Sequence, residues 1–132
     1  MEKLPIVRDH MDTEVCAVKP ETEILDAVGL LLEHRVTGAP VVDDAGHLVG
    51  MLTEKDCLRL VATGADANRP HGTVADFMTT AITTISPDTD VYYAAGLFLH
   101  QSFRRLPVVE AGKLVGAITR FDILRVIHAK LR

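Results

Sequence analysis

The chain contains two copies of one sequence unit, and this repeat limits the possible folds more than any other feature of its 132 residues. Shifted by 67 positions, residues 7–42 align with residues 74–109, and 13 of the 36 aligned pairs are identical. After a one-residue deletion, residues 45–60 align with residues 111–126, with 9 of 16 identical. Repeated units usually bury their apolar faces against one another. The repeat therefore predicts one module built from two similar halves.

Both copies predict the element order β-α-β-β-α, so the predicted fold class is α+β. A short first strand ends at a proline, and a helix with apolar residues at three- and four-residue spacing follows. Two strands joined by a tight turn come next, with Gly46 and Gly112 expected at positive φ, and a threonine starts the second helix. The elements are expected at 15–18, 21–35, 40–42, 48–52 and from Thr53, and at 82–85, 88–102, 107–109, 114–118 and from Thr119.

The repeat also predicts the domain organisation. We expect a first repeat at 1–62, a connector of small and polar residues at 63–73, and a second repeat at 74–132. A unit of about 55 residues buries too little surface to be stable alone. We therefore expect the two repeats to pack face to face about a pseudo-twofold axis.

Composition and charge exclude several classes of protein. Hydrophobic residues make up 48% and charged residues 24%, which is typical of soluble globular domains. The net charge of −4 argues against a nucleic-acid polymer as a partner. However, residues 103–132 carry seven Lys or Arg and two Asp or Glu, a basic zone that suits a small anion. No leader segment or bilayer-length apolar stretch is visible, so we expect a cytoplasmic location without a membrane partner.

The sequence shows no catalytic or metal-binding motif. Cys16 and Cys57 lie far apart without zinc-type spacing, and we expect both to be reduced, buried thiols. The six histidines show no metal-ligand spacing, and no nucleophile signature or phosphate-binding glycine loop is present. We therefore expect no metal site, no required cofactor and no enzymatic activity.

Two heptapeptides carry the candidate chemistry, at residues 50–56 and 116–122. Both read Gly-h-h-Thr-x-x-Asp, where h is hydrophobic, with Thr at a strand end and Asp on the first turn of the next helix. Unpaired N–H groups at a helix N-terminus attract phosphate, and the two carboxylate oxygens of Asp match the vicinal hydroxyls of a ribose. The same pattern resembles a capping box, with Asp replacing Glu, that only satisfies the helix N–H groups. The sequence leaves both interpretations open.

Both copies resemble CBS (cystathionine β-synthase-type) domains. The resemblance rests on the Gly-h-h-Thr-x-x-Asp and h-x-x-x-Pro-Val-Val strings, each present twice, and extends from Val7 to about Ile127. It implies a stand-alone CBS-domain pair whose ligand is AMP, ADP or ATP, or alternatively S-adenosylmethionine. It also implies a homodimer, and a regulatory output through the oligomer or through an unidentified effector protein.

The resemblance further implies that each ligand cleft takes its Thr and Asp from one repeat and its base-holding wall from the other. Arg105 resembles a phosphate-binding arginine of the family, whereas Gly38 occupies the matching position in the first repeat. We therefore expect unequal clefts, with the more phosphorylated ligand beside Asp56. One cleft would combine Thr119 and Asp122 with Cys16, Val36, Thr37, Gly38 and Ala39, and the other would combine Thr53 and Asp56 with Thr83, Phe103, Arg104, Arg105 and Leu106.

Two other functions stay open at this stage. The chain could be a structural dimerisation module with vestigial clefts. Alternatively, it could be a small nucleotide-converting enzyme, which would need a pre-organised base or metal cluster beside the cleft. For the homodimer that the resemblance implies, apolar residues of the second helices can face a partner, namely Leu58, Leu60, Leu124, Val126 and Ile127.

Overall fold

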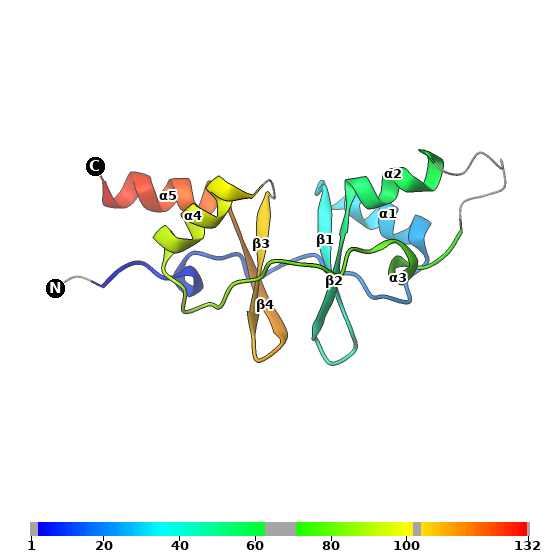
Figure 1. The fold of residues 1–132 in the computed structure, drawn as a ribbon, viewed down its shortest axis with the longest axis horizontal. Helices are drawn as coiled ribbons and strands as arrows, with labels where there is room; N and C mark the ends of the chain where they lie inside the picture. Colours follow the sequence, from blue (N-terminus) through cyan, green and yellow to red (C-terminus); the bar gives the residue numbers. More distant parts are fainter. Residues whose placement is uncertain (1–2, 63–70, 102–103, 132) are drawn as a thin grey trace. The chain divides into compact units, whose positions relative to one another are not determined.

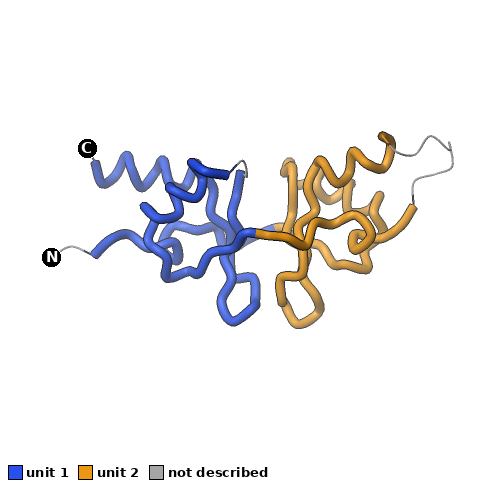
Figure 2. The backbone as a smooth tube through the Cα atoms, in the orientation of Figure 1, with its two compact units in different colours: residues 1–15, 83–132 blue, residues 16–82 orange. Residues whose placement is uncertain are grey.

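The computed structural model describes residues 3–62, 71–101 and 104–131. They form two compact units, unit 2 from residues 16–82 and unit 1 from residues 1–15 with 83–132 (Figure 2). Each unit contains one two-stranded sheet with helices, which confirms the predicted α+β class. In chain order (Figure 1), the elements are η1 (Val7–Asp9), α1 (Ile24–Glu33), β1 (Gly38–Val42), β2 (Leu48–Thr53), α2 (Glu54–Ala62), α3 (Val74–Phe77), α4 (Val91–His100), β3 (Arg105–Glu110), β4 (Lys113–Thr119) and α5 (Arg120–Lys130).

A β-hairpin forms the centre of each unit. Strands β1 and β2 pair antiparallel with Pro40 opposite Met51, and strands β3 and β4 pair with Pro107 opposite Ala117. Glycines with φ of 86° and 80° lie in the two turns, at positions 46 and 112, as the sequence predicts. Positive φ is cheap for glycine because it has no Cβ. The turn glycines therefore fix the hairpins.

The predicted first strand of each unit is reduced to a single pair of residues. Val18 pairs in parallel with Val41, and Ile85 pairs in the same way with Val108. The amide of Val18 donates to the carbonyl of Pro40 at 3.0 Å, and the amide of Ile85 donates to that of Pro107 at 3.1 Å. The amides of Val42 and Val109 donate back to the carbonyls of Val18 and Ile85 at 2.9 Å, but Pro40 and Pro107 have no N–H with which to extend the ladder. The pairing therefore does not extend into a regular strand.

The first helix of each unit is shorter than predicted. Helix α1 begins after Glu23, whose carboxylate accepts from the amide of Asp26 at 3.3 Å, and α4 begins after Asp90, whose carboxylate accepts from the amide of Tyr93 at 2.8 Å. These acidic residues act as N-caps, so the predicted first turns lie outside the helices. At the other end of α1, Arg35 has a φ of 55°, which is incompatible with a continuing helix.

The compact units do not coincide with the sequence repeats, because the opening segment of each repeat packs into the other unit. Val7 lies in the unit 1 core, where its amide donates to the carbonyl of Thr89 at 2.8 Å. The equivalent Val74, in α3, lies in the unit 2 core and donates to the carbonyl of Thr22 at 2.8 Å. The β-α-β-β-α pattern did not include η1 and α3. Each unit is therefore completed by a segment distant in sequence.

A glycine in each second strand allows these opening segments to approach. A Cβ added to Gly50 would lie 2.6 Å from the sulfur of Met78, and one added to Gly116 would lie 2.7 Å from the carbonyl oxygen of Asp12. Residues Thr79 and Asp12 pair with Met51 and Ala117 of these strands. The first residue of each Gly-h-h-Thr-x-x-Asp motif therefore lies where an opening segment packs closely, and at Gly116 the nearest atom belongs to the backbone.

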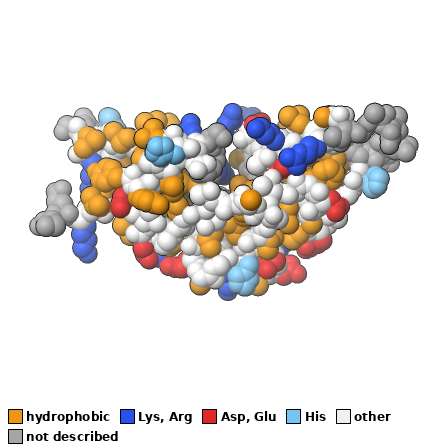
Figure 3. Space-filling model, viewed as in Figure 1, with side chains coloured by type: hydrophobic (Ala, Val, Ile, Leu, Met, Phe, Trp, Pro, Cys, Tyr) orange, Lys and Arg blue, Asp and Glu red, His pale blue; other side chains and the backbone are white. Residues whose placement is uncertain are grey.

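The helices divide into core-facing and outward-facing sides. On α5, Ile123 and Val126 are buried, whereas Leu124 and Ile127 are 57% and 40% exposed. The prediction that Val126 faces a partner is therefore wrong, because residues three apart on a helix share its core face. Leu60 likewise packs partly against the unit 2 core, whereas Leu58 is exposed. Figure 3 shows hydrophobic side chains on the outer surface of α4 and α5.

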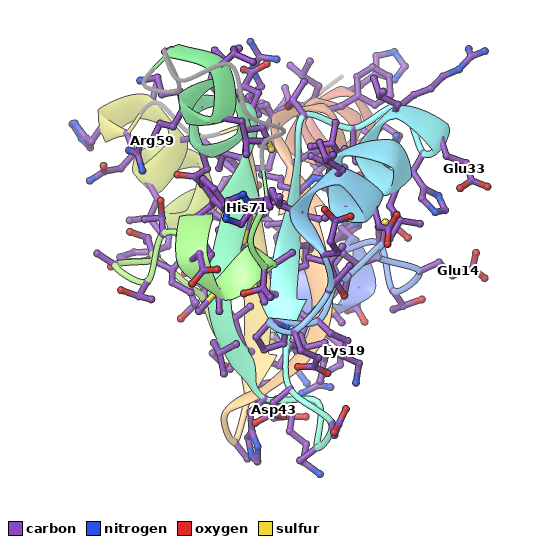
Figure 4. All side chains as sticks on the ribbon, turned by 90° about the vertical axis from the view of Figure 1, so that its right-hand side faces the viewer. Glu14, Lys19, Glu33, Asp43, Arg59 and His71 are labelled. Atoms are coloured by element: carbon purple, nitrogen blue, oxygen red, sulfur yellow. The ribbon has the colours of Figure 1, made fainter. Side chains whose placement is uncertain are left out.

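Hydrogen bonds and an ion pair of charged side chains stabilise the β1–β2 turn. The carboxylate of Asp43 accepts from the amides of Ala45 and His47, each at 2.9 Å. These hydrogen bonds, chiefly that from His47, lower the pKa of Asp43. Lys19 reaches the same turn (Figure 4), donating to the carbonyl of Asp43 at 3.3 Å and pairing with Asp44 at 3.0 Å.

Within the described part of the chain, no helix combines the length and apolar character that a bilayer span requires.

Candidate functional site

Both Thr-x-x-Asp motifs lie where a buried strand continues directly into a helix. Thr53 is the last residue of β2 and Thr119 is the last residue of β4, and α2 and α5 begin at the next residue. Both helix starts were predicted from the sequence. Since β2 and β4 are held in their hairpins, each Asp is placed on the first turn of its helix with its carboxylate directed back at the Thr.

In unit 2, Asp56 is at the centre of a hydrogen-bond cluster. One carboxylate oxygen, Oδ2, accepts from the amide and the hydroxyl of Thr53 at 2.9 and 3.0 Å. The hydroxyl of Thr79 donates to Asp56 as well, lying 3.1 Å from Oδ1 and 3.4 Å from Oδ2. The guanidinium of Arg59 lies 3.4 Å from Oδ1. Asp56 is only 1% exposed, so these groups replace water around a buried charge.

In unit 1, Asp122 has fewer partners. The amide of Thr119 donates to Oδ2 of Asp122 at 2.8 Å, and the Thr119 hydroxyl accepts from the amide of Asp122 at 3.2 Å. The guanidinium of Arg125 pairs with Oδ1. The side chain of Arg125 is 60% exposed and lies over the ring of Phe121. Asp122 is 6% exposed.

These contacts realise the capping-box geometry in both units. Each Asp accepts from the amide of its Thr, and each Thr hydroxyl accepts from the amide of its Asp. The reciprocal bonds satisfy N–H groups that the first turn of a helix leaves unpaired. A carboxylate has about four lone-pair sites, so capping alone does not prevent it from accepting further donors. The capping and ligand-binding interpretations are therefore compatible.

The other predicted residues of unit 2 surround the start of β1. Gly38 lies opposite Thr53 in the hairpin register, and the carbonyl of Thr37 accepts from the amide of Glu54 at 2.9 Å. Val36 packs against the core, Ala39 is buried, and Thr37 is exposed. Cys16 is half-buried at the edge of the same unit. Unit 2 thus contains Thr53 and Asp56 with five of the predicted wall residues.

Unit 1 contains the second set of predicted residues. Arg105 lies opposite Thr119 in the hairpin register and is half-buried, whereas Arg104 and Thr83 are exposed. Leu106 is fully buried in the core, and Phe103 lies outside the described residues. Leu106 therefore has no exposed surface for a ligand. The combination of each wall with the Thr and Asp of the other repeat stays a prediction.

Charge distinguishes the two helix starts. Among residues 3–62, 71–101 and 104–131, neither Arg104 nor Arg105 has an ion-pair partner. Glu110, the acidic residue on the same strand as Arg105, pairs with Arg8 at 2.7 Å. Arg120 donates to the carbonyls at the end of α4, at 3.4 Å. Unit 1 therefore offers Arg105 opposite Thr119 and Arg104 next to it in sequence, neither with a carboxylate partner in the described part of the chain.

Sequence reasoning missed three residues around the carboxylates. Arg59 and Arg125 are identical at the position three residues after each Asp, so the repeat alignment already contained a signal for the ion pairs. Thr79 was missed because its equivalent in the alignment is Asp12, so that position showed no shared residue. Its contact with Asp56 depends on the packing of a segment 23 positions away.

The cysteines and histidines form no site among the described residues. Cys16 and Cys57 are both thiols and are half-buried, rather than fully buried as predicted. Burial, with a smaller contribution from the charge of Asp56, raises the pKa of the Cys57 thiol. No group of three His, Cys, Asp or Glu side chains in the described ranges is placed to hold a metal ion.

A family model for the CBS domain matches residues 7–63 and residues 74–129. The chain belongs to the CBS-domain family. Both predicted repeats are CBS domains, and each match includes one complete Gly-h-h-Thr-x-x-Asp motif. The CBS-domain protein YhcV of Bacillus subtilis is 36% identical over 118 residues, which cover 89% of this chain and 81% of that protein. Against two other curated relatives, the chain spans 42% and 56% of their length.

Two solved structures resemble the CBS pair over nearly its full length. The crystal structure of CBSX2 of Arabidopsis thaliana in complex with AMP is 37% identical, with a TM-score of 0.84, and the match covers 97% of this chain and 99% of that one. The CBS domain pair of protein MJ0100, in complex with 5′-methylthioadenosine and S-adenosyl-L-methionine, is 26% identical with a TM-score of 0.76 and the same coverage.

Proposed function

We propose that this CBS pair binds adenosine nucleotides as a regulatory signal and does not convert them. The observation that supports this most directly is the fixed pair of Thr and Asp at the N-terminus of a helix in both units. The AMP complex of CBSX2, which shares 37% identity with this chain, supports an adenosine ligand. The MJ0100 complex makes S-adenosylmethionine a second candidate.

The chemistry of the motif assigns a role to each group. The Asp carboxylate accepts hydrogen bonds from the ribose hydroxyls, and hydrogen bonds to a charged acceptor contribute about 1.5–3 kcal/mol. The helix N-terminus and the Thr hydroxyl favour the negatively charged phosphate. Half-buried apolar side chains such as Val36 supply a surface for the purine.

The arginines of unit 1 provide the charge that a phosphate requires. Arg104 and Arg105 have no ion-pair partner among the described residues, and Arg105 lies opposite Thr119. A guanidinium forms two parallel, charge-assisted hydrogen bonds with a phosphate. At the matching positions of unit 2 stand Thr37 and Gly38, which carry no charge. Phosphate binding should therefore depend on the arginines of unit 1.

Thermal unfolding tests the proposal. A ligand present at 100 times its Kd stabilises the folded state by about 2.7 kcal/mol. We expect AMP, ADP, ATP or S-adenosylmethionine to raise the melting temperature, with GMP as the control for base specificity. If no adenosine compound raises it, and calorimetry detects no heat of binding, the proposal is wrong.

The regulatory output would pass through another polypeptide or through the oligomer. The outer faces of α2 and α5 carry exposed apolar side chains, including Leu58 and Leu124. Such surfaces often mark protein interfaces. We propose a homodimer and an effector protein as partners. The cytoplasmic location, and the exclusion of nucleic-acid and membrane partners, stay predictions.

A structural dimerisation module is the second candidate function. The observation that favours it is the use of both carboxylates as buried helix caps. Under this alternative, Leu58→Glu with Leu124→Glu would abolish the dimer in analytical ultracentrifugation, while adenosine nucleotides would have no effect on the wild type. Nucleotide binding by the wild type would exclude vestigial clefts.

A further inference from the structure

We infer that the two Thr-x-x-Asp motifs have different roles. Asp122 accepts hydrogen bonds from the ribose of the nucleotide, whereas Asp56 has a structural role and is held by a hydrogen bond from the hydroxyl of Thr79. This inference rests on the proposed function and specifies its site. It predicts one nucleotide for each chain. It also replaces the expectation of a more phosphorylated ligand beside Asp56, which rested on the sequence position of Arg105.

The hydrogen-bonding capacity of Asp56 is already used. Its two oxygens accept from the Thr53 amide, the Thr53 hydroxyl and the Thr79 hydroxyl, at 2.9 to 3.4 Å, and Arg59 lies 3.4 Å from Oδ1. A carboxylate has about four lone-pair sites. Three donors and one guanidinium therefore occupy them all. A ribose would have to displace the Thr79 hydroxyl, which forms a hydrogen bond to a buried charge.

Asp122 retains capacity for a ligand. Among the described residues, only the Thr119 amide and the Arg125 guanidinium donate to it. About two of its lone-pair sites stay available, which is the number that the two vicinal hydroxyls of a ribose require. Arg125 and Arg59 are 60% and 62% exposed, so both ion pairs are partly solvated and cost little to rearrange. The difference between the two carboxylates therefore rests on the hydroxyls of Thr53 and Thr79, which donate to Asp56.

One position of the repeat accounts for the difference. Thr79 and Asp12 are equivalent in the alignment, and their backbones pair with the second strands in the same way, each with two 2.9 Å hydrogen bonds, to Met51 and Ala117. The threonine hydroxyl has a proton to donate to Asp56. The carboxylate of Asp12 offers no such proton and instead accepts from the amide of Glu14 at 2.9 Å. Thr79 is therefore a positioning residue that acts through Asp56.

Calorimetry with AMP on the full chain tests this division. We expect the wild type to bind one AMP for each chain, and Asp122→Asn to weaken binding about tenfold to a hundredfold. In wild type, 2′-deoxy-AMP should bind more weakly than AMP, and Asp122→Asn should abolish that difference. If Asp56→Asn loses AMP while Asp122→Asn retains it, the inference is wrong.

Thr79→Val provides a second test that does not depend on removing a buried charge. Valine keeps the shape of the side chain but removes the donor, so the freed Asp56 should create a second, weaker AMP site. The reciprocal variant Asp12→Thr should introduce a donor beside Asp122 and weaken the single site. A stoichiometry of one in Thr79→Val, with unchanged affinity in Asp12→Thr, would overturn the inference.

Unfolding without ligand separates this inference from the proposed function. We expect Asp56→Asn to lower the melting temperature more than Asp122→Asn does, because its amide would face three donors. If neither the wild type nor any variant binds AMP, the proposed function is wrong, and so is the ribose-binding role of Asp122. Equal melting temperatures for the two Asn variants would show that Asp56 does not have the structural role inferred for it.

Discussion

Unit 2 and unit 1 have the same hairpin, the same two helices and the same Thr-x-x-Asp turn, but they differ in what surrounds the carboxylate. The Asp of unit 2 is held by Thr79, whereas Asp12 stands at that position in unit 1. The strand opposite the Thr begins with Gly38 in one unit and Arg105 in the other. Both copies keep the Arg three residues after the Asp, whereas the residues at the Thr79/Asp12 position and opposite the Thr differ. The duplication thus preserved a scaffold and separated the sites.

The shared core should respond equally in the two units. Leu52 and Ile118 are equivalent in the repeat and both are fully buried. We expect Leu52→Ala and Ile118→Ala to lower the free energy of unfolding by about 2–5 kcal/mol each in urea denaturation, because each leaves a cavity. Leu32→Ala, on a 74% exposed side chain of α1, is the control and should change it by less than about 0.5 kcal/mol. A large effect in one unit only would break the equivalence.

Gly50 and Gly116, against which the opening segments pack, should respond unequally to substitution by alanine. A Cβ on Gly116 meets the Asp12 carbonyl oxygen at 2.7 Å, whereas one on Gly50 first meets the flexible end of Met78. We expect Gly116→Ala to cost about 1–3 kcal/mol in chemical denaturation, and Gly50→Ala to cost less because the thioether moves aside. The helix variant Gly29→Ala is the control: its Cβ meets nothing within 4 Å, so stability should rise. A greater loss at Gly50 would contradict this.

The ion pairs of Arg8 in unit 1 should contribute to stability only at low salt. Arg8 pairs with Asp88 at 3.2 Å and with Glu110 at 2.7 Å, whereas unit 2 has Ala75 at the equivalent position. We expect Arg8→Ala to lower the melting temperature slightly at low ionic strength and to have no effect at high salt, because exposed ion pairs are screened. Lys19→Ala, which breaks the exposed ion pair with Asp44 at 3.0 Å, is the comparison in unit 2 and should show the same salt dependence. A loss that persists at high salt would mean that Arg8 acts through packing instead.

The smallest effect is expected in the β1–β2 turn, and only at acidic pH. Hydrogen bonds from His47 and Ala45 hold the pKa of Asp43 below its ordinary value of 3.8. A carboxyl whose folded pKa is lowered stabilises the fold above the ordinary pKa, and this contribution is lost as the pH falls through the folded value. Asp43→Asn should therefore reduce the acid sensitivity of urea unfolding below about pH 4, with Asp44→Asn as the control. An unchanged pH profile would contradict this.

The repeat predicted the hairpins and both helix starts because these depend on local signals. A turn glycine, a proline and a Thr before a helix act within a few residues of themselves. The first strands and first helices were predicted too long, because Pro40 lacks an N–H and Glu23 and Asp90 act as caps. Such competition between neighbouring groups is visible only once the backbone is placed.

The surroundings of the carboxylates depended on distant segments. Thr79 reaches Asp56 only because α3 and the residues after it dock on β2. No local pattern encodes that contact, and the alignment pairs Thr79 with an unlike residue. In the same way, Val126 appeared to be an interface residue because apolar character alone does not distinguish the two faces of a short helix. Site chemistry was therefore predicted less completely than fold class.

The exchange of opening segments also sets an order for folding during synthesis. Unit 2 is one continuous stretch, residues 16–82, which ends within the opening segment of the second repeat, so all of its residues are translated before residues 83–132. Residues 1–15 are translated before unit 2, but their hydrogen-bond partners, such as Thr89, are translated much later. At 5–20 residues per second, residues 16–132 take roughly 6–23 s to follow. During that interval the core that Val7 enters is incomplete, so this early segment is among the last to reach its place.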